Sequence, residues 1–137
     1  MHEVTAFRNW SVSGHAVVSA PAEVDIRTAE LFRRALATAA GLSSSFVIAD
    51  MGHTRACDSA AVAMLIGLSS HLSRAGGELR LVVCEPGLLR VLAVTDKDRA
   101  LHVFTSLPEA LAAARQESGE SPVHPARPDY RVVPETA

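Results

Sequence analysis

The sequence predicts an α/β fold, with a small mixed β-sheet of four to five strands packed with about four α-helices. Two observations predict it. Short apolar and β-branched runs alternate along the chain with longer segments whose apolar residues recur at helical spacing. Because strands that alternate with helices need crossover connections, and these are right-handed, the later strands should lie mostly parallel. The 137 residues suffice for one domain with a core of its own.

The first half of the chain should fold as two strands, a helix and a third strand. Residues 4–9 and 15–20 are expected to pair as a hairpin through the turn residues SVSG. Residues 28–41 have helical periodicity and should form a helix that Gly41 terminates. Its buried face is expected to hold Leu31, Phe32, Ala35, Leu36 and Ala39. Residues 45–50 show no alternation, so they should form a strand buried on both faces.

The second half should continue the alternation between helix and strand. We expect helices at residues 59–75, 86–94 and 106–115, and strands at 78–84 and 101–104. Gly76 and Gly77 are typical of a helix end, so they should terminate the first of these helices. Ser106 and Glu109 have the spacing of a capping box at the start of the last helix.

The composition changes after residue 115. Residues 116–137 hold four of the seven prolines, and their apolar residues follow no period. Such a segment has too little apolar surface to form a core. We therefore expect one folded domain at residues 1–115 and a flexible, Pro-rich C-terminal tail at residues 116–137.

Composition also argues against several classes of protein. The 13 basic and 15 acidic residues are spread along the chain, so we expect no direct nucleic acid binding. The longest apolar run, residues 60–68, is far shorter than the about 20 residues that a membrane helix needs. The N-terminal segment does not resemble a signal peptide, and the two cysteines have no zinc-binding spacing. We expect a cytoplasmic protein with no metal site, no cofactor and no membrane contact.

Asp58 and Ser59 stand directly before a long apolar segment, in RACDSAAVAMLIGL. One interpretation is that one of them caps a helix, because both side chains accept hydrogen bonds from its unpaired N–H groups. A second interpretation uses the same N–H groups and the positive end of the helix dipole, which favour a phosphate on the Ser59 hydroxyl. That phosphate would add nearly two negative charges beside Asp58 and change the surface offered to a partner.

Catalysis is a third interpretation, and the sequence does not favour it. His53 lies in the loop before the Asp-Ser pair, but there is no G-x-S-x-G elbow and nothing identifies an oxyanion hole. Glu23, Asp25 and Asp50 suggest the acidic cluster of an aspartyl-phosphate receiver. The first strands supply no acidic pair, however, and Lys97 precedes the last strand instead of ending one. We therefore expect no catalytic residue and no enzyme activity.

With its elements placed, the sequence resembles the STAS domain, the fold of bacterial anti-sigma factor antagonists, from about residue 4 to residue 115. The Glu-Leu-Asp segment that leads into this family's first helix is similar to AEVDIRTAELFRRAL. The family's next strand, loop and Asp-Ser-x-Gly helix start resemble FVIADMGHTRACDSAAVAMLIGL. Its third strand, Pro-led short helix and final strand and helix resemble AGGELRLVVCEPGLLRVLAVTDKDRALHVFTSLPEAL. The ordered set is more specific than any one segment.

The resemblance implies an anti-sigma factor antagonist that acts by partner switching. Members of the family bind an anti-sigma factor that is also an ATP-dependent serine kinase, and so release a sigma factor. The kinase phosphorylates the Ser that follows the Asp, here Ser59, which turns the antagonist off, and a metal-dependent serine phosphatase restores it. By position, the expected partner-binding residues are Glu23, Asp25, Asp50, Asp58, Ser59, Ala60, Ala61, Val62 and Met64.

One residue of the helix start departs from the family pattern. Ala61 stands where the family has Gly, and we expect its methyl group to narrow the approach of a partner backbone. The same resemblance leaves an alternative function open. A STAS module that does not switch would bind a protein or a small ligand such as a nucleotide, with Ser59 only a helix cap.

Overall fold

The computed structural model describes residues 7–43, 45–97 and 99–114, and it confirms the predicted mixed sheet. The main sheet has five strands in the order β1-β2-β4-β6-β7, namely β1 (Arg8–Val12), β2 (His15–Ser19), β4 (Val47–Met51), β6 (Leu79–Val83) and β7 (His102–Phe104). β1 and β2 pair antiparallel, and the other neighbours in this sheet are parallel. The expected tail, residues 116–137, lies outside the described residues.

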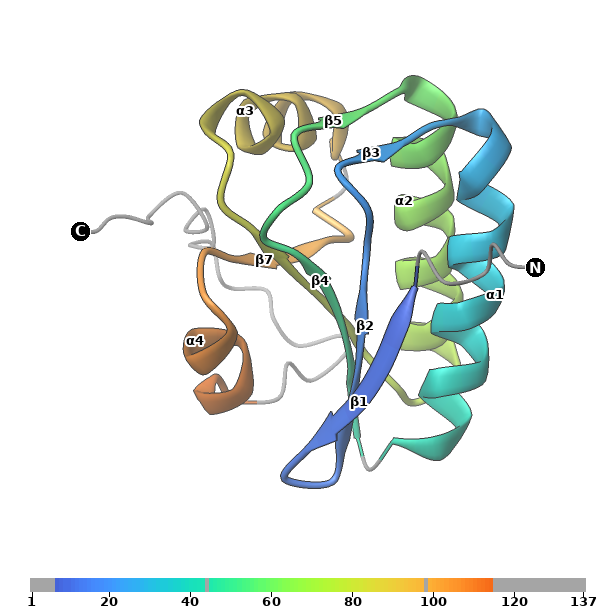
Figure 1. The fold of residues 1–137 in the computed structure, drawn as a ribbon. Coiled ribbons are helices and arrows are strands. Elements are labelled where there is room, and N and C mark those ends of the chain that lie inside the picture. Colours follow the sequence, from blue (N-terminus) through green and yellow to red (C-terminus); the bar gives the residue numbers. More distant parts are fainter. Residues whose placement is uncertain (1–6, 44, 98, 115–137) are drawn as a thin grey trace.

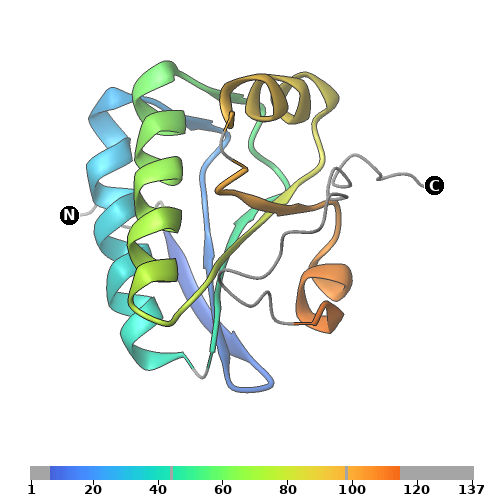
Figure 2. The ribbon, with the colours of Figure 1, turned by 180° about the vertical axis from the view of Figure 1, so that it is seen from behind.

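The helices pack on both faces of this sheet. They are α1 (Ile26–Leu42), α2 (Ser59–Arg74), α3 (Pro86–Thr95) and α4 (Leu107–Ala112). α1 and α2 lie side by side on one face, α4 lies on the other, and α3 lies at the end where α1 and α2 begin (Figures 1 and 2). In the described part of the chain, no helix is both long enough and apolar enough to cross a membrane.

Two clusters of buried side chains form the core. The larger lies between the sheet and the helix pair, and its members with no exposed surface include Phe32, Leu36, Val47, Leu65 and Leu81. The smaller lies between the sheet and α4 and consists of Val17, Phe46, Ile48, Val82 and Ala110. Because β4 contributes to both clusters, the prediction that its strand is buried on both faces is confirmed.

The first hairpin differs from the prediction in its turn. The expected turn SVSG is displaced, because β1 continues through Val12 and pairs it with His15. Residues 4–6 of the strand expected at residues 4–9 lie outside the described residues. The connection is the two residues Ser13 and Gly14, which have φ angles of 54° and 82°. Positive φ at both positions is the backbone of a type I′ turn, which matches the twist of a hairpin. The pair Ser-Gly was therefore the turn signal, and Ser11 belongs to the strand.

α1 is longer than the predicted helix at both ends. It begins at Ile26, because Asp25 caps it, and it ends at Leu42. Gly41 therefore lies inside the helix and does not terminate it. Phe32, Leu36 and Ala39 are buried as expected, but Leu31 is 48% exposed and lies at the margin of the buried face.

The end of α2 and the start of α4 follow the predicted signals, with one difference at α4. Gly76, with a φ of +91°, and Gly77 terminate α2, and their amides donate to the carbonyls of Ser73 and Leu72 as in a Schellman motif. At the start of α4, the amide of Glu109 donates to Ser106 Oγ at 3.2 Å. The other half of the expected capping box is absent among the described contacts, since the Glu109 carboxylate accepts a hydrogen bond from Thr105.

Candidate functional site

Two short strands that the sequence analysis did not predict bring the starts of α1 and α2 together. β3 (Glu23–Val24) and β5 (Ala56–Cys57) pair in parallel just before the two helices begin. Next to this pair, Thr54 Oγ1 donates to the carbonyl of Pro21 at 2.7 Å, and the amide of Arg55 donates to Ala22 at 2.7 Å. The two crossover segments therefore run side by side, at the carboxyl ends of the parallel strands (Figure 1).

Asp25 caps the N-terminus of α1. Its Oδ1 accepts the amides of Arg27 and Thr28, while Thr28 Oγ1 accepts the amide of Asp25 to complete a capping box. The Arg27 guanidinium lies 3.3 Å from Asp25 Oδ2. Burial alone would raise the pKa of Asp25, but these hydrogen bonds outweigh it and hold the pKa below its ordinary value. Asp25 is therefore a carboxylate at neutral pH, committed to its own helix.

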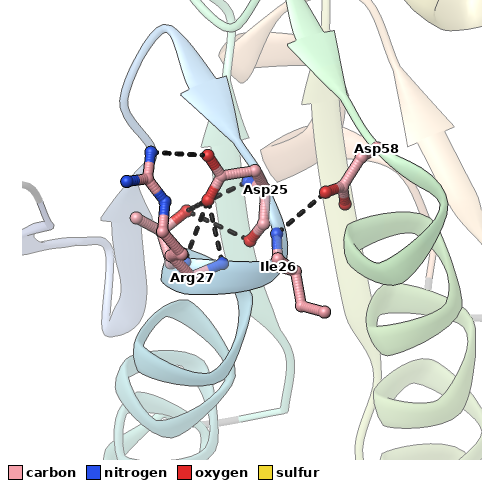
Figure 3. A network of polar contacts seen from close by, with 5 residues as sticks. Asp25, Ile26, Arg27 and Asp58 are labelled. Atoms are coloured by element: carbon pink, nitrogen blue, oxygen red, sulfur yellow. Dashed lines mark hydrogen bonds and ion pairs between the residues drawn. The ribbon is translucent and has the colours of Figure 1, made fainter.

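Asp58 caps α2 and also contacts α1. Its Oδ1 accepts the amide of Ala61 at 2.9 Å, which makes it the N-cap of α2. Its Oδ2 accepts the amide of Ile26, also at 2.9 Å, as Figure 3 shows. One carboxylate thus serves backbone donors of two helices that lie far apart in the sequence.

Ser59 is the first residue of α2 and is exposed. Ser59 is not the helix cap, because Asp58 supplies the oxygen that the cap requires. Among the described residues, the amides of Ser59 and Ala60 have no protein acceptor. The exposed hydroxyl therefore stands beside open N–H donors at a helix start, an environment that favours an anion.

The structure does not bring all the expected acidic residues into contact. Glu23 is exposed on β3, next to the chain segment that leads to Asp58. Asp50 lies at the end of β4, half-buried, where its Oδ1 accepts the amide of Gly52 at 3.0 Å. Asp58 bonds to the amide of Ile26, the residue that follows Asp25, so Asp25 and Asp58 lie at adjoining helix starts.

The expected apolar contacts on α2 divide between surface and core. Ala60 is half-exposed, and Met64 is half-buried and packs against the core. Ala61 and Val62 are only 0% and 2% exposed, so the expectation that their side chains meet a partner does not fit their burial. The methyl group of Ala61 also cannot narrow the approach of a partner backbone, because it points into the core. The departure from Gly at this position therefore leaves the exposed surface unchanged.

The groups that a hydrolytic or thiol mechanism would need are not assembled here. His53 is exposed, and no hydrogen bond joins it to Ser59 within the described residues. Burial and the neighbouring Asp58 raise the pKa of Cys57 to about 11, so its thiol is protonated at neutral pH. Residues 7–43, 45–97 and 99–114 contain no group of three or more metal-ligating side chains close enough to share an ion.

Ile26 is the residue of this region that the sequence analysis missed. It follows the Asp25 cap, its amide is bonded to Asp58, and its side chain is 70% exposed. A signal was available in the sequence. Asp25 and Thr28 have capping-box spacing, which starts the helix at Ile26 and leaves this large apolar side chain outside the buried stripe.

The fold and the site define a small α/β domain with an exposed serine at the start of a helix. The STAS domain family profile matches residues 10–110. Because this match spans most of the 137 residues, the chain belongs to the STAS domain family. No curated protein matches the chain by sequence.

Solved structures with the same fold include proteins of different kinds. An anti-sigma factor antagonist from Mycobacterium paratuberculosis has 22% identity and a TM-score of 0.67, over 77% of this chain and 89% of its own. The Bacillus cell fate determinant SpoIIAA, in its phosphorylated form, has 21% identity and a TM-score of 0.58, over 77% and 96%. A murine anion transporter of the Solute Carrier 26 family has 22% identity and a TM-score of 0.59, over 74% of this chain and 18% of the transporter.

Proposed function

We propose that this chain is a cytoplasmic anti-sigma factor antagonist that acts by partner switching and is not an enzyme. In its unmodified form it binds an anti-sigma factor that is also an ATP-dependent serine kinase, and this binding releases a sigma factor. The kinase phosphorylates Ser59, which ends the binding. A serine phosphatase removes the phosphate and restores the antagonist.

The observation that carries this proposal is the division of roles between Asp58 and Ser59. Asp58 provides the cap of α2, so the Ser59 hydroxyl is exposed and is not needed to hold the helix. A phosphate on Ser59 would lie beside the open amides of Ser59 and Ala60, which stabilise negative charge at a helix start. Membership of the STAS family and the similarity in fold to anti-sigma factor antagonists support the same assignment.

The proposed contact surface surrounds Ser59 at the start of the two helices. It consists of the expected residues whose side chains are exposed or half-exposed, namely Glu23, Asp25, Asp50, Asp58, Ser59, Ala60 and Met64. Most of its charge is already negative in the unmodified protein. About two more negative charges from a phosphate would turn a surface matched to a partner into one that repels it.

Phosphorylation by the cognate kinase is the direct test. The purified chain is incubated with ATP and this kinase, and the intact mass is measured. We expect the addition of one phosphate to the wild type and to Ser73→Ala, an exposed serine at the other end of α2, and none to Ser59→Ala. No added phosphate on the wild type would refute the switch, and equal incorporation into Ser59→Ala would refute the site.

Binding to the same kinase tests the electrostatic part of the proposal. Ser59→Asp places a negative charge at residue 59, whereas Ser59→Asn has nearly the same size and no charge. We expect calorimetry to show at least about tenfold weaker binding for Ser59→Asp and a much smaller change for Ser59→Asn. Equal affinities of the two variants would contradict a switch based on charge.

A second candidate function is a STAS module that binds a partner without being switched. The murine transporter supports this candidate, because its TM-score to this chain, 0.59, is close to the 0.58 of phosphorylated SpoIIAA. Similarity in fold therefore does not distinguish the two functions. An interaction with the kinase that persists in the presence of ATP, without modification of Ser59, would favour this candidate.

A further inference from the structure

The two oxygen atoms of the Asp58 carboxylate serve two different helices. Oδ1 accepts the amide of Ala61, three residues further along the same helix. Oδ2 accepts the amide of Ile26, 32 residues earlier in the chain. The dashed line in Figure 3 crosses directly from the start of α2 to the start of α1. No other side chain among the described residues bonds to backbone amides of both helices.

The Ile26 amide depends on Asp58 because nothing within α1 can accept it. The first N–H groups of a helix have no intrahelical partner. In α1 the Asp25 side chain accepts the amides of Arg27 and Thr28, and the Asp25 carbonyl accepts that of Ala29. The amide of Ile26 remains, and Asp58 accepts it at 2.9 Å. The N-terminal turn of α1 is therefore completed by a residue of another helix.

We propose that Asp58 is a positioning residue that joins the N-terminus of α1 to that of α2, and that negative charge on Ser59 weakens its bond to Ile26. The second clause deepens the proposed function, since Ser59 is where that function adds a phosphate. The first clause is independent of any kinase. Asp58 then acts on a partner through the backbone that it holds in place.

The effect of charge at residue 59 follows from the chemistry of adjacent anions. A phosphate at the start of α2 competes with Asp58 for the amides of the first turn, and it repels the neighbouring carboxylate. The bond to Ile26 is the more vulnerable one, because it connects two separate segments, whereas the bond to Ala61 is held within one helical turn. The change at Ser59 is thereby passed to α1, whose exposed Ile26 side chain adjoins the same surface.

The bond between Asp58 and the Ile26 amide can be tested without a kinase or a partner. Amide hydrogen exchange of the full chain is measured residue by residue by NMR. Asp58→Asn retains one carbonyl oxygen, which can still cap α2, but its NH₂ group cannot accept the Ile26 amide. We expect exchange at Ile26 to become at least about fivefold faster in Asp58→Asn, with little change at Arg27. The control Asp25→Ala removes the single oxygen that accepts the amides of Arg27 and Thr28, so it should accelerate exchange at these two residues and leave Ile26 protected.

A second pair of variants tests the transfer of charge with Asp58 intact. We expect Ser59→Glu to accelerate exchange at Ile26 by about threefold or more, and Ser59→Gln to leave it within error of the wild type. A purely structural role of Asp58 would not distinguish these two variants. Unchanged exchange at Ile26 in Asp58→Asn would refute the claim that Asp58 holds the start of α1. Equal exchange at Ile26 in Ser59→Glu and Ser59→Gln would refute the claim that charge at residue 59 weakens this bond. Failure of the kinase to modify Ser59 would refute the proposed function and leave both exchange results standing.

Discussion

Neighbouring polar residues at the start of α2 experience different demands from the fold. The carboxylate of Asp58 has two oxygens and accepts an amide with each of them, so it is fixed in place. Ser59 follows as the first residue of α2, where its hydroxyl is not needed to cap the helix. Cys57, one residue before Asp58, packs against the core. Three consecutive residues are thus committed to core, cap and surface.

The difference between the two thiols of this chain gives a prediction that depends on pH. Burial and Asp58 raise the pKa of Cys57 to about 11, whereas Cys84 is exposed at the end of β6. Since only the thiolate reacts, the alkylation rate of Cys57 should rise about tenfold per pH unit and level off only near pH 11. We expect iodoacetamide at pH 8 to label Cys84 well before Cys57, as measured by peptide mass spectrometry. Equal labelling at pH 8 would contradict this environment of Cys57.

At the scale of elements, the long periodic segments could be predicted and the short or exceptional ones could not. The apolar periods of α1 and α2 and the continuous apolar run of β4 reflect burial directly, so these elements could be predicted. β3 and β5 have two residues each, and two residues carry no period. Gly41 looked like a helix end because glycine is common there, but Ser43 is the cap and the helix includes Gly41.

The candidate site was predictable to the same extent. The Asp58–Ser59 pair and the acidic residues could be identified from their position before a helix. Which of the pair forms the cap could not, because both residue types are good caps. The contact of Asp58 with Ile26 joins residues 32 apart, and it depends on how two crossovers pack. The burial of Ala61 likewise follows from the rotation of α2 about its axis on the sheet. The sequence pattern does not determine this rotation to within one residue.

Two glycines with different backbone conformations give a prediction for the ends of α1 and α2. A Cβ at Gly41 would meet no atom within 4 Å in a helical backbone, so Gly41→Ala should stabilise the fold by up to about 1 kcal/mol. Gly76 has a φ of +91°, so Gly76→Ala should destabilise it by about 1–2 kcal/mol. Urea unfolding of both variants measures the difference. The account fails if the two substitutions change the free energy of unfolding in the same direction.

At the scale of the whole molecule, a buried arginine connects the sheet to its second face. Arg80 of β6 has no exposed surface, and its Nε donates to the Glu78 carboxylate at 2.9 Å. Its other nitrogens donate to the carbonyls of Ala110 in α4 and of Ala114 just after it. The guanidinium also lies 3.6 Å from the centre of the Phe46 ring. α4 is only six residues long, and this group adds polar bonds to the apolar packing of Leu107, Ala110 and Leu111 on the sheet.

Removal of Arg80 should therefore be costly to the whole fold. Arg80→Met eliminates the donors to α4 and the cation beside Glu78, and breaking a buried ion pair typically costs about 3–5 kcal/mol. The control is Arg34→Met, which removes one exposed partner of Glu30 and should leave stability almost unchanged. Urea unfolding with circular dichroism checks both variants. A loss for Arg80→Met no larger than that for the control would show that the buried pair does not hold α4.

The antiparallel pairing of β1 with β2 also gives the molecule a built-in optical reporter. Trp10 is the only tryptophan in the sequence, and it lies opposite Val17 in the hairpin register. Opposite residues of an antiparallel pair project from the same face, so the indole shares the face that α4 covers. It is 43% exposed, and Val17 packs in one cluster with Ala110 of α4. Because β1 lies at the edge of the sheet and, among the described strands, pairs there only with β2, the fluorescence of the unlabelled protein reports on the integrity of this hairpin.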